Sequence, residues 1–429
     1  MKQVLDLHIH SRYARACSPR LTLSNISQTG LIKGVDIIAT GDFTYPAWFK
    51  SIQEELEETW LGSGLYRLKG SDDSSTKFIL GTELALIYKD GDKTRRIHLV
   101  VHAPNLEAVA ELNRQLDKRF NIRSDGRPIL GINAPDLVKL LLKIDSRFLI
   151  YPAHIWTPWF AVFGSKSGFD SLEECFKDQT DHIYAFETGL SSDPEMNWRL
   201  SALDNLTMLS SSDAHSLNNI GREANVMELS ARPSYDDIYR IIKEHLRLAP
   251  DVIKTGNIGL RETLEFYPEE GRYHLDGHRD CGFSCLPEES RRLHNICPVC
   301  HKPLVIGVLN RVEELADRPV GYRPKNAVGF KKLVELDKII AEGLRLKGRQ
   351  SQAVQKVYRR LIAVFGNELK ILLEADLKMI ANESSPLIAE GIRRVRLGEL
   401  LINPGFDGEY GRVAVFSESD KVLEQDKLL

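Results

Sequence analysis

Two pairs of residues, near the start and near the middle of the chain, have the spacing of metal ligands. His8 and His10 form an H-x-H at the end of the apolar run 4–9, and Asp213 and His215 repeat this spacing in Ser-Asp-Ala-His. Side chains alternate across a strand with period two, so each pair projects to one face. Imidazole and carboxylate together suit Zn, Mn or Fe. The spacing therefore predicts a metal centre to which both pairs contribute.

Four further residues of metal-binding type stand beside hydrophobic runs: Asp42, Glu83, His98 and His154. We interpret each as lying at a strand end, and the carboxyl ends of barrel strands are where active sites are built. Buried histidines and acids can also simply form hydrogen bonds with one another. That so many of them stand at expected strand ends argues against this alternative. His102 competes with His98 as a ligand, and the sequence leaves this choice open. The set predicts a metal centre at the mouth of a β/α barrel.

The first 250 residues alternate β-like and helix-like segments, which indicates an α/β architecture. Strands are expected around Leu5, Ile38, Ile79, Val100, Leu149, Ala185 and Leu209. Helices are expected over 105–120, 135–143, 194–203 and 235–245. We predict a phosphoesterase barrel over 1–250, a zinc-binding module over 251–320 and a basic, mostly helical domain over 321–429.

Four cysteines are clustered after residue 280. Cys281, Cys285, Cys297 and Cys300 are spaced as two short turns, which is the arrangement that supplies four thiolates to a tetrahedral zinc. A redox dithiol would need a thioredoxin-like strand and helix that this region lacks. The pattern predicts one structural Zn.

Lysine and arginine outnumber acids between residues 323 and 360, and they recur with helical periodicity. Such a run is often only a solvated helical face. A local cationic surface on an otherwise acidic protein is also typical of nucleic-acid binding, and we favour DNA. The candidate DNA contacts in this region are Lys331, Lys332 and Arg349.

A loop that follows His154 is rich in aromatic residues. Trp156, Trp159 and Phe160 could stack an unpaired base or pack as a lid, while Ser165 and Lys166 could contact phosphates. A second loop ends at Asp193, a residue that can cap the helix that follows or contact substrate; capping is the commoner role for Asp-Pro.

Composition limits the class of protein. The chain has 429 residues, 42% of them hydrophobic, which is enough for two or three cores. Its net charge is −3, so the whole surface is not basic. No apolar run approaches the roughly 18 residues of a membrane helix, and no signal peptide is recognisable. We expect a cytoplasmic protein with no membrane partner.

Four segments resemble the motifs of the polymerase-and-histidinol-phosphatase superfamily: 6–10, 81–84, 152–154 and 212–215. This resemblance implies a distorted β/α barrel with two or three metal ions that hydrolyses phosphate esters. The sequence departs from the pattern in two places. The second motif ends in Asp42 where a histidine is usual, and the third histidine after the first motif is absent. Both departures weaken the expected third metal position.

The chain as a whole resembles the endonuclease Q family. The resemblance includes the variant Thr-Gly-Asp-Phe motif, the tryptophan-rich loop, the four-cysteine module and the turn Phe-Asp-Gly-Glu-Tyr-Gly at 406–411. It implies cleavage of damaged double- or single-stranded DNA on the 5′ side of uracil, hypoxanthine, xanthine or an abasic site. Spacing and composition do not reveal this base preference.

These observations predict a metal-dependent endodeoxyribonuclease with two or three Zn, Mn or Mg ions. His8, His10, Glu83 and Asp213 would hold one ion. Glu83, His98 and His154 would hold a second, and Asp42 with His215 a third. The catalytic candidates are Asp213, Glu83, His10 and Asp193. The damaged nucleotide would be flipped into a pocket.

Two alternatives remain at this stage. A small-molecule phosphomonoesterase of histidinol-phosphatase type would use the same metals, and a scaffold protein with a decayed barrel would use none. The C-terminal segment 425–429 loosely matches a peptide that docks sliding clamps, although a frayed, charged end explains it as well.

Overall fold

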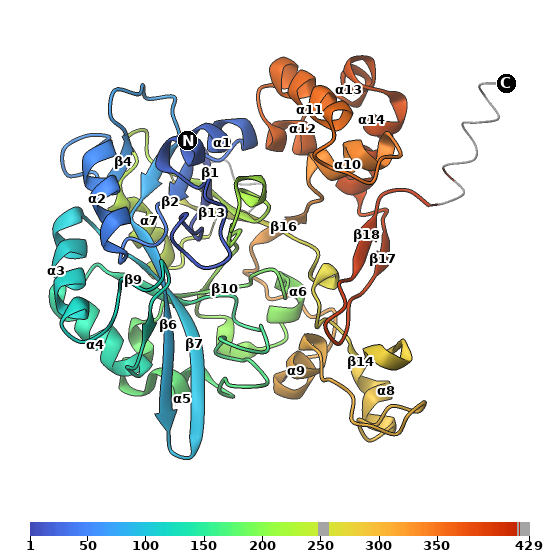
Figure 1. Ribbon diagram of the computed structural model, residues 1–429, viewed down its shortest axis with the longest axis horizontal. Coiled ribbons are helices and arrows are strands. Elements are labelled where there is room, and N and C mark those ends of the chain that lie inside the picture. The colour runs from blue at the N-terminus through green and yellow to red at the C-terminus, as the bar shows by residue number, and fades with distance from the viewer. Residues whose placement is uncertain (248–256, 418–419, 421–429) are drawn as a thin grey trace. The chain divides into compact units, whose positions relative to one another are not determined.

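The structure, a computed structural model, describes residues 1–247, 257–417 and 420 (Figure 1). The chain divides into two compact units. Unit 1 comprises Met1–Leu31, Val35–Glu265 and Ile306–Lys331, and unit 2 comprises Ile32–Gly34, Phe266–Val305 and Lys332–Leu429. The cysteine-rich segment and the C-terminal helices thus belong to one unit. The three-domain division remains a prediction about independent folding.

The strands of unit 1 form two larger sheets and a pair. The eight-stranded sheet has the order β16-β13-β12-β1-β2-β5-β4-β3, with β16 at Gly329–Lys332, β13 at Gly259–Glu265, β12 at Ala224–Glu228, β1 at Lys2–Asp6, β2 at Ile37–Ala39, β5 at Lys77–Ile79, β4 at Leu65–Leu68 and β3 at Leu56–Glu58. The four-stranded sheet has the order β8-β6-β7-β9, with β8 at Ile129–Leu130, β6 at Gly81–Asp90, β7 at Lys93–His102 and β9 at Leu149–Pro152. β10 at Ala185–Glu187 pairs in parallel with β11 at Thr207–Leu209.

Hydrogen bonds just beyond the strands join these sheets into a ring. β1 pairs in parallel with β2, and β2 with β5. The Ala103 N–H donates to the Leu80 carbonyl at 3.2 Å, which links β7 to β5. The Ile155 N–H donates to the Glu187 carbonyl at 3.0 Å, and Ile9 forms a parallel bridge with Ala214. The ring closes as a distorted barrel, and this confirms the predicted α/β fold.

Helices pack outside the barrel strands (Figure 1). They are α1 at Leu23–Lys33, α2 at Pro46–Glu55, α3 at Leu106–Asp117, α4 at Ala134–Ile144, α5 at Leu172–Phe176, α6 at Pro194–Asn197, α7 at Tyr235–Lys243 and α9 at Val308–Leu315. Side-chain caps begin several of them. Asn105 and Asn133 cap α3 and α4, and Ser234 forms a capping box with Asp237 at α7. Such local signals explain why these starts were predictable from sequence.

The hairpin of β6 and β7 departs from the predicted layout. Glu83 and His98 were expected at strand ends, but both lie inside this antiparallel hairpin of two ten-residue strands. Glu83 pairs with Val100, and His98 pairs with Ala85. Because the strands are antiparallel, position in the hairpin rather than a carboxyl end brings both side chains to the centre. The strand-end interpretation was therefore wrong for this pair.

Unit 2 combines small hairpins with a helical bundle. The hairpins are β14 at Asp276–His278 with β15 at Phe283–Cys285, and β17 at Leu401–Asn403 with β18 at Arg412–Ala414. The helices are α8 at Pro287–Arg292, α10 at Leu336–Gly343, α11 at Gln352–Phe365, α12 at Glu368–Leu373, α13 at Leu377–Glu383 and α14 at Pro386–Leu397. The predicted helical C-terminal region is confirmed.

The sequence also led to predictions about a membrane partner and about a clamp-binding segment at the C-terminal end. Across the described residues, none of the helices has the length and apolar character that a membrane span requires. The clamp-like segment 425–429 lies outside the described residues.

Candidate metal centre

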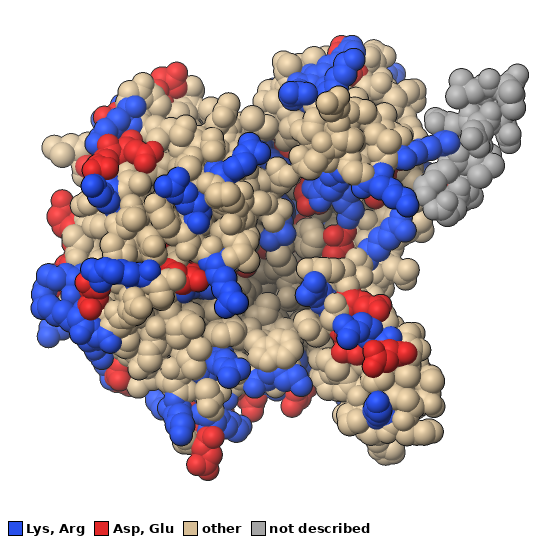
Figure 2. Space-filling view, in the orientation of Figure 1, with Lys and Arg blue, Asp and Glu red and all other residues tan. Residues whose placement is uncertain are grey.

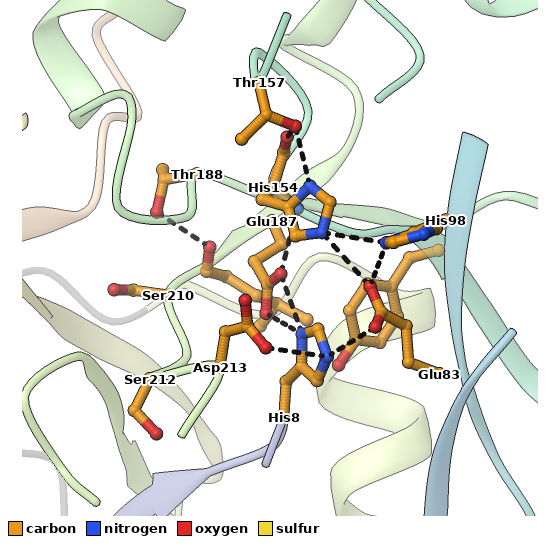
Figure 3. A network of polar contacts seen from close by, with 12 residues as sticks. His8, Glu83, His98, His154, Thr157, Glu187, Thr188, Ser210, Ser212 and Asp213 are labelled. Carbon is orange, nitrogen blue, oxygen red and sulfur yellow. Dashed lines mark hydrogen bonds and ion pairs between the residues drawn. The ribbon is translucent and has the colours of Figure 1, made fainter. Parts of the chain in front are cut away.

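Four predicted ligands meet at the mouth of the barrel. Ligand atoms of His8, His10, Glu83 and Asp213 all lie within 4.8 Å of one another; we call these residues the first cluster. His10 Nε2 lies 3.1 Å from Asp213 Oδ1 and 3.3 Å from Glu83 Oε2. His8 Nε2 lies 3.7 Å from the same Glu83 oxygen. Figure 3 shows the His8 ring facing the carboxylates of Glu83, Glu187 and Asp213.

The atoms that face the middle of the first cluster lack hydrogen-bond partners. Among the described residues, none donates to or accepts from His8 Nε2, His10 Nε2 or Asp213 Oδ1, although all three atoms are buried. Leaving a buried polar atom unpaired is costly, so such atoms call for an explanation. Imidazole nitrogens and carboxylate oxygens that converge in this way fit a divalent cation.

Each histidine of the first cluster is oriented by a carboxylate on its far side. Glu187 Oε2 lies 3.1 Å from His8 Nδ1, and Asp42 Oδ1 lies 2.9 Å from His10 Nδ1. An ionised carboxylate can only accept, so Nδ1 carries the proton and Nε2 is left with its lone pair. Outer carboxylates of this kind fix the tautomer and the ring orientation of metal-binding histidines.

The two residues predicted to hold a third ion have other contacts in the structure, and the third site stays a prediction. Asp42 was expected to hold an ion with His215, but Asp42 accepts from the Ser11 N–H at 2.6 Å as well as contacting His10. His215 Nδ1 contacts the Asp213 carbonyl oxygen at 2.8 Å. Asp42 and His215 belong to none of the groups of three or more ligand atoms found among the described residues. Asp42 is placed as an orienting partner of His10.

A second cluster comprises Glu83, His98 and His154. Glu83 Oε1 lies 2.7 Å from His98 Nδ1 and 3.1 Å from His154 Nε2. The two Glu83 oxygens thus face different clusters, as a bridging ligand would. His102 lies elsewhere: its ring nitrogens contact the Leu80 carbonyl and the Tyr151 hydroxyl. The structure therefore places His98, not His102, at the site.

Charge interactions keep the acids of both clusters ionised. Burial alone would raise the pKa of Asp213, but His10 Nε2, which lies 3.1 Å from its Oδ1, and the charge of His8 hold that pKa below its usual value. Burial likewise opposes ionisation of Glu83, yet His98 and Arg127 lower its pKa. Burial lowers the pKa of His98 to about 4, so its ring is neutral and able to bind a metal at neutral pH. His8 and His10 differ from His98: burial opposes their charge, but the carboxylates of Glu187 and Asp42 raise the pKa of these two rings, so a bound cation would displace a proton from each.

Backbone strain coincides with the site. Asp42, His154 and Asp213 have positive φ angles of 46°, 29° and 45°, a region that non-glycine residues seldom adopt. A strained backbone of this kind is maintained only where surrounding contacts hold it in place, and it is common at functional sites. Asp6 supplies part of that constraint because its oxygens accept from the N–H groups of Ser212 and Gly221. Sequence reasoning missed Asp6, although its i, i+2 relation to His8 was a usable signal.

The cysteine-rich segment brings three of the four predicted cysteines together with a histidine, and the predicted four-cysteine ligand set stays a prediction. Ligand atoms of His278, Cys281, Cys297 and Cys300 lie within 4.8 Å of one another. Cys285 packs in the same small core but is not part of this group. The spacing of four cysteines concealed His278, because its position depends on the β14–β15 hairpin. A zinc with three thiolates and one imidazole is a common structural site.

The aromatic loop divides between core and surface. Trp156 is 1% exposed, and its Nε1–H donates to Asn197 Oδ1 at 2.7 Å, so its ring is unavailable for stacking on a base. Trp159 is 39% exposed. Phe160 packs against the His98 ring with 4.6 Å between centroids. Ser165 and Lys166 are exposed.

The remaining predicted contacts have partners within the protein. Lys331 pairs with Glu262 at 3.0 Å, Lys332 lies 3.8 Å from Glu269, and Arg349 Nε donates to Asp337 at 3.0 Å. Over the face drawn in Figure 2, basic and acidic side chains are interleaved. Asp193 caps α6 by accepting from the Met196 N–H at 2.9 Å, as its position before a proline suggested. The roles of these four residues toward DNA and substrate stay predictions.

Comparison with known proteins places the whole chain beside structurally known nucleases. The lesion-specific endonuclease PfuEndoQ from Pyrococcus furiosus superposes with a TM-score of 0.83 at 29% identity, covering 100% of this chain and 99% of that one. An endonuclease Q bound to a 27-mer duplex, with an abasic lesion at its active site, superposes with a TM-score of 0.82 at 30% identity. That alignment covers 97% of this chain and 98% of the other.

Curated sequences match as well. The uncharacterized protein MJ0043 of Methanocaldococcus jannaschii is 33% identical over 261 residues, which is 60% of this chain but only 31% of that protein. The uncharacterized protein YqxK of Bacillus subtilis is 29% identical over 96% of this chain and 100% of its own length. Residues 335–399 match the family described as the MJ0043 C-terminal domain.

Proposed function

The chain belongs to the endonuclease Q family, and we propose that it is a DNA repair endonuclease that cuts beside damaged nucleotides. The observation that carries this proposal is the near-complete alignment with a relative that holds an abasic lesion of a duplex at its active site. We further propose that the cut falls on the 5′ side of uracil, hypoxanthine, xanthine or an abasic site. The proposal places this chain among metal-dependent phosphodiester hydrolases.

The two barrel clusters fit divalent ions. His8, His10, Glu83 and Asp213 would hold one ion, and Glu83, His98 and His154 a second. When bound, divalent ions make a water acidic enough to attack near neutral pH and stabilise charge on the phosphate. Zn, Mn and Mg are the candidate metals; imidazole ligands favour zinc, and carboxylate ligands suit Mn and Mg. His278 with Cys281, Cys297 and Cys300 would hold a structural zinc.

The chain's own side chains position these ligands and the DNA. Glu187 and Asp42 hold the rings of His8 and His10 with Nε2 directed inward. Trp159 offers an exposed aromatic face close in sequence to His154, suited to stacking on an unpaired base. Flipping costs least for mispaired or abasic nucleotides, so lesions are easier to extrude than paired bases.

A phosphomonoesterase of histidinol-phosphatase type is the second candidate. The observation that favours it is that the two clusters lie within unit 1, so small phosphate esters could be hydrolysed by the barrel alone. Unit 2, with its cysteine-rich segment and helices, has no evident purpose in that reaction.

The deciding experiment uses 5′-labelled duplexes that carry one uracil, hypoxanthine, xanthine or abasic site, with an undamaged duplex as control. We expect a single metal-dependent cut 5′ to the lesion, mapped on a sequencing gel, and no cut with chelator. Asp213→Ala should lower the rate by at least about 10³-fold, because it removes a ligand of the first cluster. Asp73→Ala, at an exposed loop position, is the matched control and should keep full activity.

Two outcomes would overturn the proposal. One is hydrolysis of a small phosphomonoester with no cleavage of any lesion duplex, which would favour the second candidate. The other is an unchanged cleavage rate in Asp213→Ala, which would remove the metal mechanism.

A further inference from the structure

An arginine that sequence reasoning did not single out reaches into the first cluster. Arg127 lies directly before β8 in the loop after α3. β8 pairs in parallel with β6, with Ala85 opposite Ile129, and the Ala85 N–H donates to the Pro128 carbonyl at 3.1 Å. Continuing that register back by two residues sets Arg127 beside Glu83. The position of the arginine is thus a consequence of strand pairing.

The guanidinium of Arg127 contacts the carboxylate that both clusters share. Its Nη1–H donates to Glu83 Oε2 at 2.8 Å, the same oxygen that lies 3.3 Å from His10 Nε2. The side chain is 24% exposed, so one side of the guanidinium faces outward. A guanidinium keeps its charge near neutral pH whatever its surroundings. The cluster therefore contains a permanent cation.

The loop that carries Arg127 is held in place against the first motif. The Gly126 N–H donates to the Tyr13 carbonyl at 3.0 Å, and the Arg127 N–H donates to Asp125 Oδ1 at 2.9 Å. A Cβ at Gly126 would lie 2.6 Å from Asp42 Oδ2, so only glycine permits this approach. The loop thus lies directly beside Asp42, one of the two residues predicted to hold a third ion.

We propose that Arg127 supplies the positive charge of a third barrel ion and binds a non-bridging oxygen of the scissile phosphate. Asp42 is already engaged by His10 and the Ser11 N–H, so it has a structural reason not to be a ligand. The inference rests on the proposed phosphodiesterase function. It adds that the reaction uses two barrel ions and one covalently fixed cation.

The chemistry of the guanidinium suits this role. Arginine presents five N–H donors in a rigid fork that matches phosphate oxygens, and it cannot lose its charge near neutral pH. The bond to Glu83 uses one donor and fixes the orientation of the group. The side chain is partly exposed, and we infer that the donors not bonded to Glu83 meet the phosphate. A donor aimed in advance at developing negative charge stabilises the transition state without reorganisation.

The number of ions is the first test. Crystals of the zinc-loaded full chain, measured at the zinc absorption edge, should show two anomalous peaks in the barrel, with the Arg127 guanidinium still bonded to Glu83. A third barrel peak between Asp42 and His215, or an Arg127 side chain displaced from the site, would overturn the proposal. This readout depends on neither DNA nor activity.

Hydrolysis of bis(p-nitrophenyl) phosphate, a phosphodiester without a lesion, is the second test. Arg127→Met should lower kcat by about 10²-fold, in line with the loss of one transition-state donor. Arg127→Lys keeps the positive charge but loses the planar set of N–H donors, so its kcat should lie between those of the wild type and Arg127→Met. Arg123→Met is the control because Arg123 is exposed in the same loop and pairs with Asp117. Thermal melts and zinc content confirm that each variant is folded and loaded.

The outcomes separate the inference from the proposed function. A wild-type protein that hydrolyses this reporter but no lesion duplex would refute the DNA function, and the Arg127 variants would still decide the inference. An Arg127→Met rate within about threefold of wild type would refute the inference while leaving lesion cleavage intact. A wild type inactive on both substrates would refute both.

Discussion

At the scale of single residues, a side chain of metal-ligand type can bind an ion only if its oxygen or nitrogen atoms are not held by other hydrogen-bond partners. Asp42 is of metal-ligand type, but His10 Nδ1 and the Ser11 N–H occupy its oxygens. His102 is likewise of ligand type, yet burial lowers its pKa to about 3 and its nitrogens contact Leu80 and Tyr151. Residue type alone therefore predicts too many metal ligands. The hydrogen-bond partners of each side chain show which candidates have other contacts.

Asp42→Asn tests this assignment. The amide oxygen can still accept from His10, but the charge that holds the imidazole is lost, so barrel metal affinity should fall by about 10- to 100-fold. At saturating zinc, the number of barrel ions should be unchanged. Competition with a chromophoric chelator measures the affinity, and Asp73→Asn serves as the exposed control. Loss of an ion at saturation would instead identify Asp42 as a ligand.

At the scale of elements, two β-hairpins determine which residues meet at the barrel site and in the cysteine-rich segment. Their pairing cannot be recognised from the spacing of residues in the sequence. The β6–β7 hairpin carries Glu83 and His98 on opposite strands, and the β14–β15 hairpin carries His278 and Cys285. In the second hairpin, His278 pairs with Phe283 and Cys285 pairs with Asp276. This register separates the two residues, so that His278 joins Cys281, Cys297 and Cys300 while Cys285 packs in the small core.

Substitution of these two residues should therefore have opposite effects on zinc. His278→Ala should release the structural zinc to a chelator far more readily and lower the Tm of unit 2, because a structural zinc contributes folding free energy. Cys285→Ser should retain the zinc, with a modest loss of Tm from the altered core. Zinc release and calorimetry on the full chain measure both. Zinc retained in His278→Ala and lost in Cys285→Ser would restore the four-cysteine assignment.

At the scale of the whole molecule, charge is distributed rather than concentrated. The net charge is −3, and basic and acidic side chains are interleaved over the face in Figure 2. Several predicted DNA-binding cations are paired with carboxylates, as Lys331 is with Glu262.

Glu265 should make stability depend on pH. Burial raises its pKa to about 7, from an ordinary value near 4.5, and the Thr188 hydroxyl donates to its Oε2. Because the folded state holds this proton more tightly, the stabilisation is present at low pH and is lost as pH rises through about 7. Glu265→Gln, which mimics the protonated acid, should abolish this loss.

The comparison is made between pH 5 and pH 8 at saturating zinc, so that metal-linked effects cancel between the two proteins. Between pH 5 and pH 8, the free energy of unfolding of Glu265→Gln should rise by on the order of 2 kcal/mol relative to that of the wild type. The gap in Tm should therefore widen as pH rises. A gap that is constant with pH, or that narrows, would show that Glu265 is ionised in the folded protein.

The sequence by itself determined the residues that repeat at short range. The H-x-H and D-x-H pairs, the helix caps and the paired cysteines are local patterns, because strand periodicity and capping act over two to four residues. They sufficed for the α/β class and for three members of the first cluster, His8, His10 and Asp213. Resemblance of whole motifs then identified the family, which spacing alone could not do.

Only the tertiary structure decided which of these residues meet. Strand register placed Arg127 beside Glu83 across 44 positions of sequence, and the β14–β15 hairpin brought His278 close to Cys281, Cys297 and Cys300. Trp156 is buried in the core, and the oxygens of Asp42 contact His10 Nδ1 and the Ser11 N–H. Each outcome depends on packing between segments distant in sequence. Residue type and local spacing carry no information about such contacts.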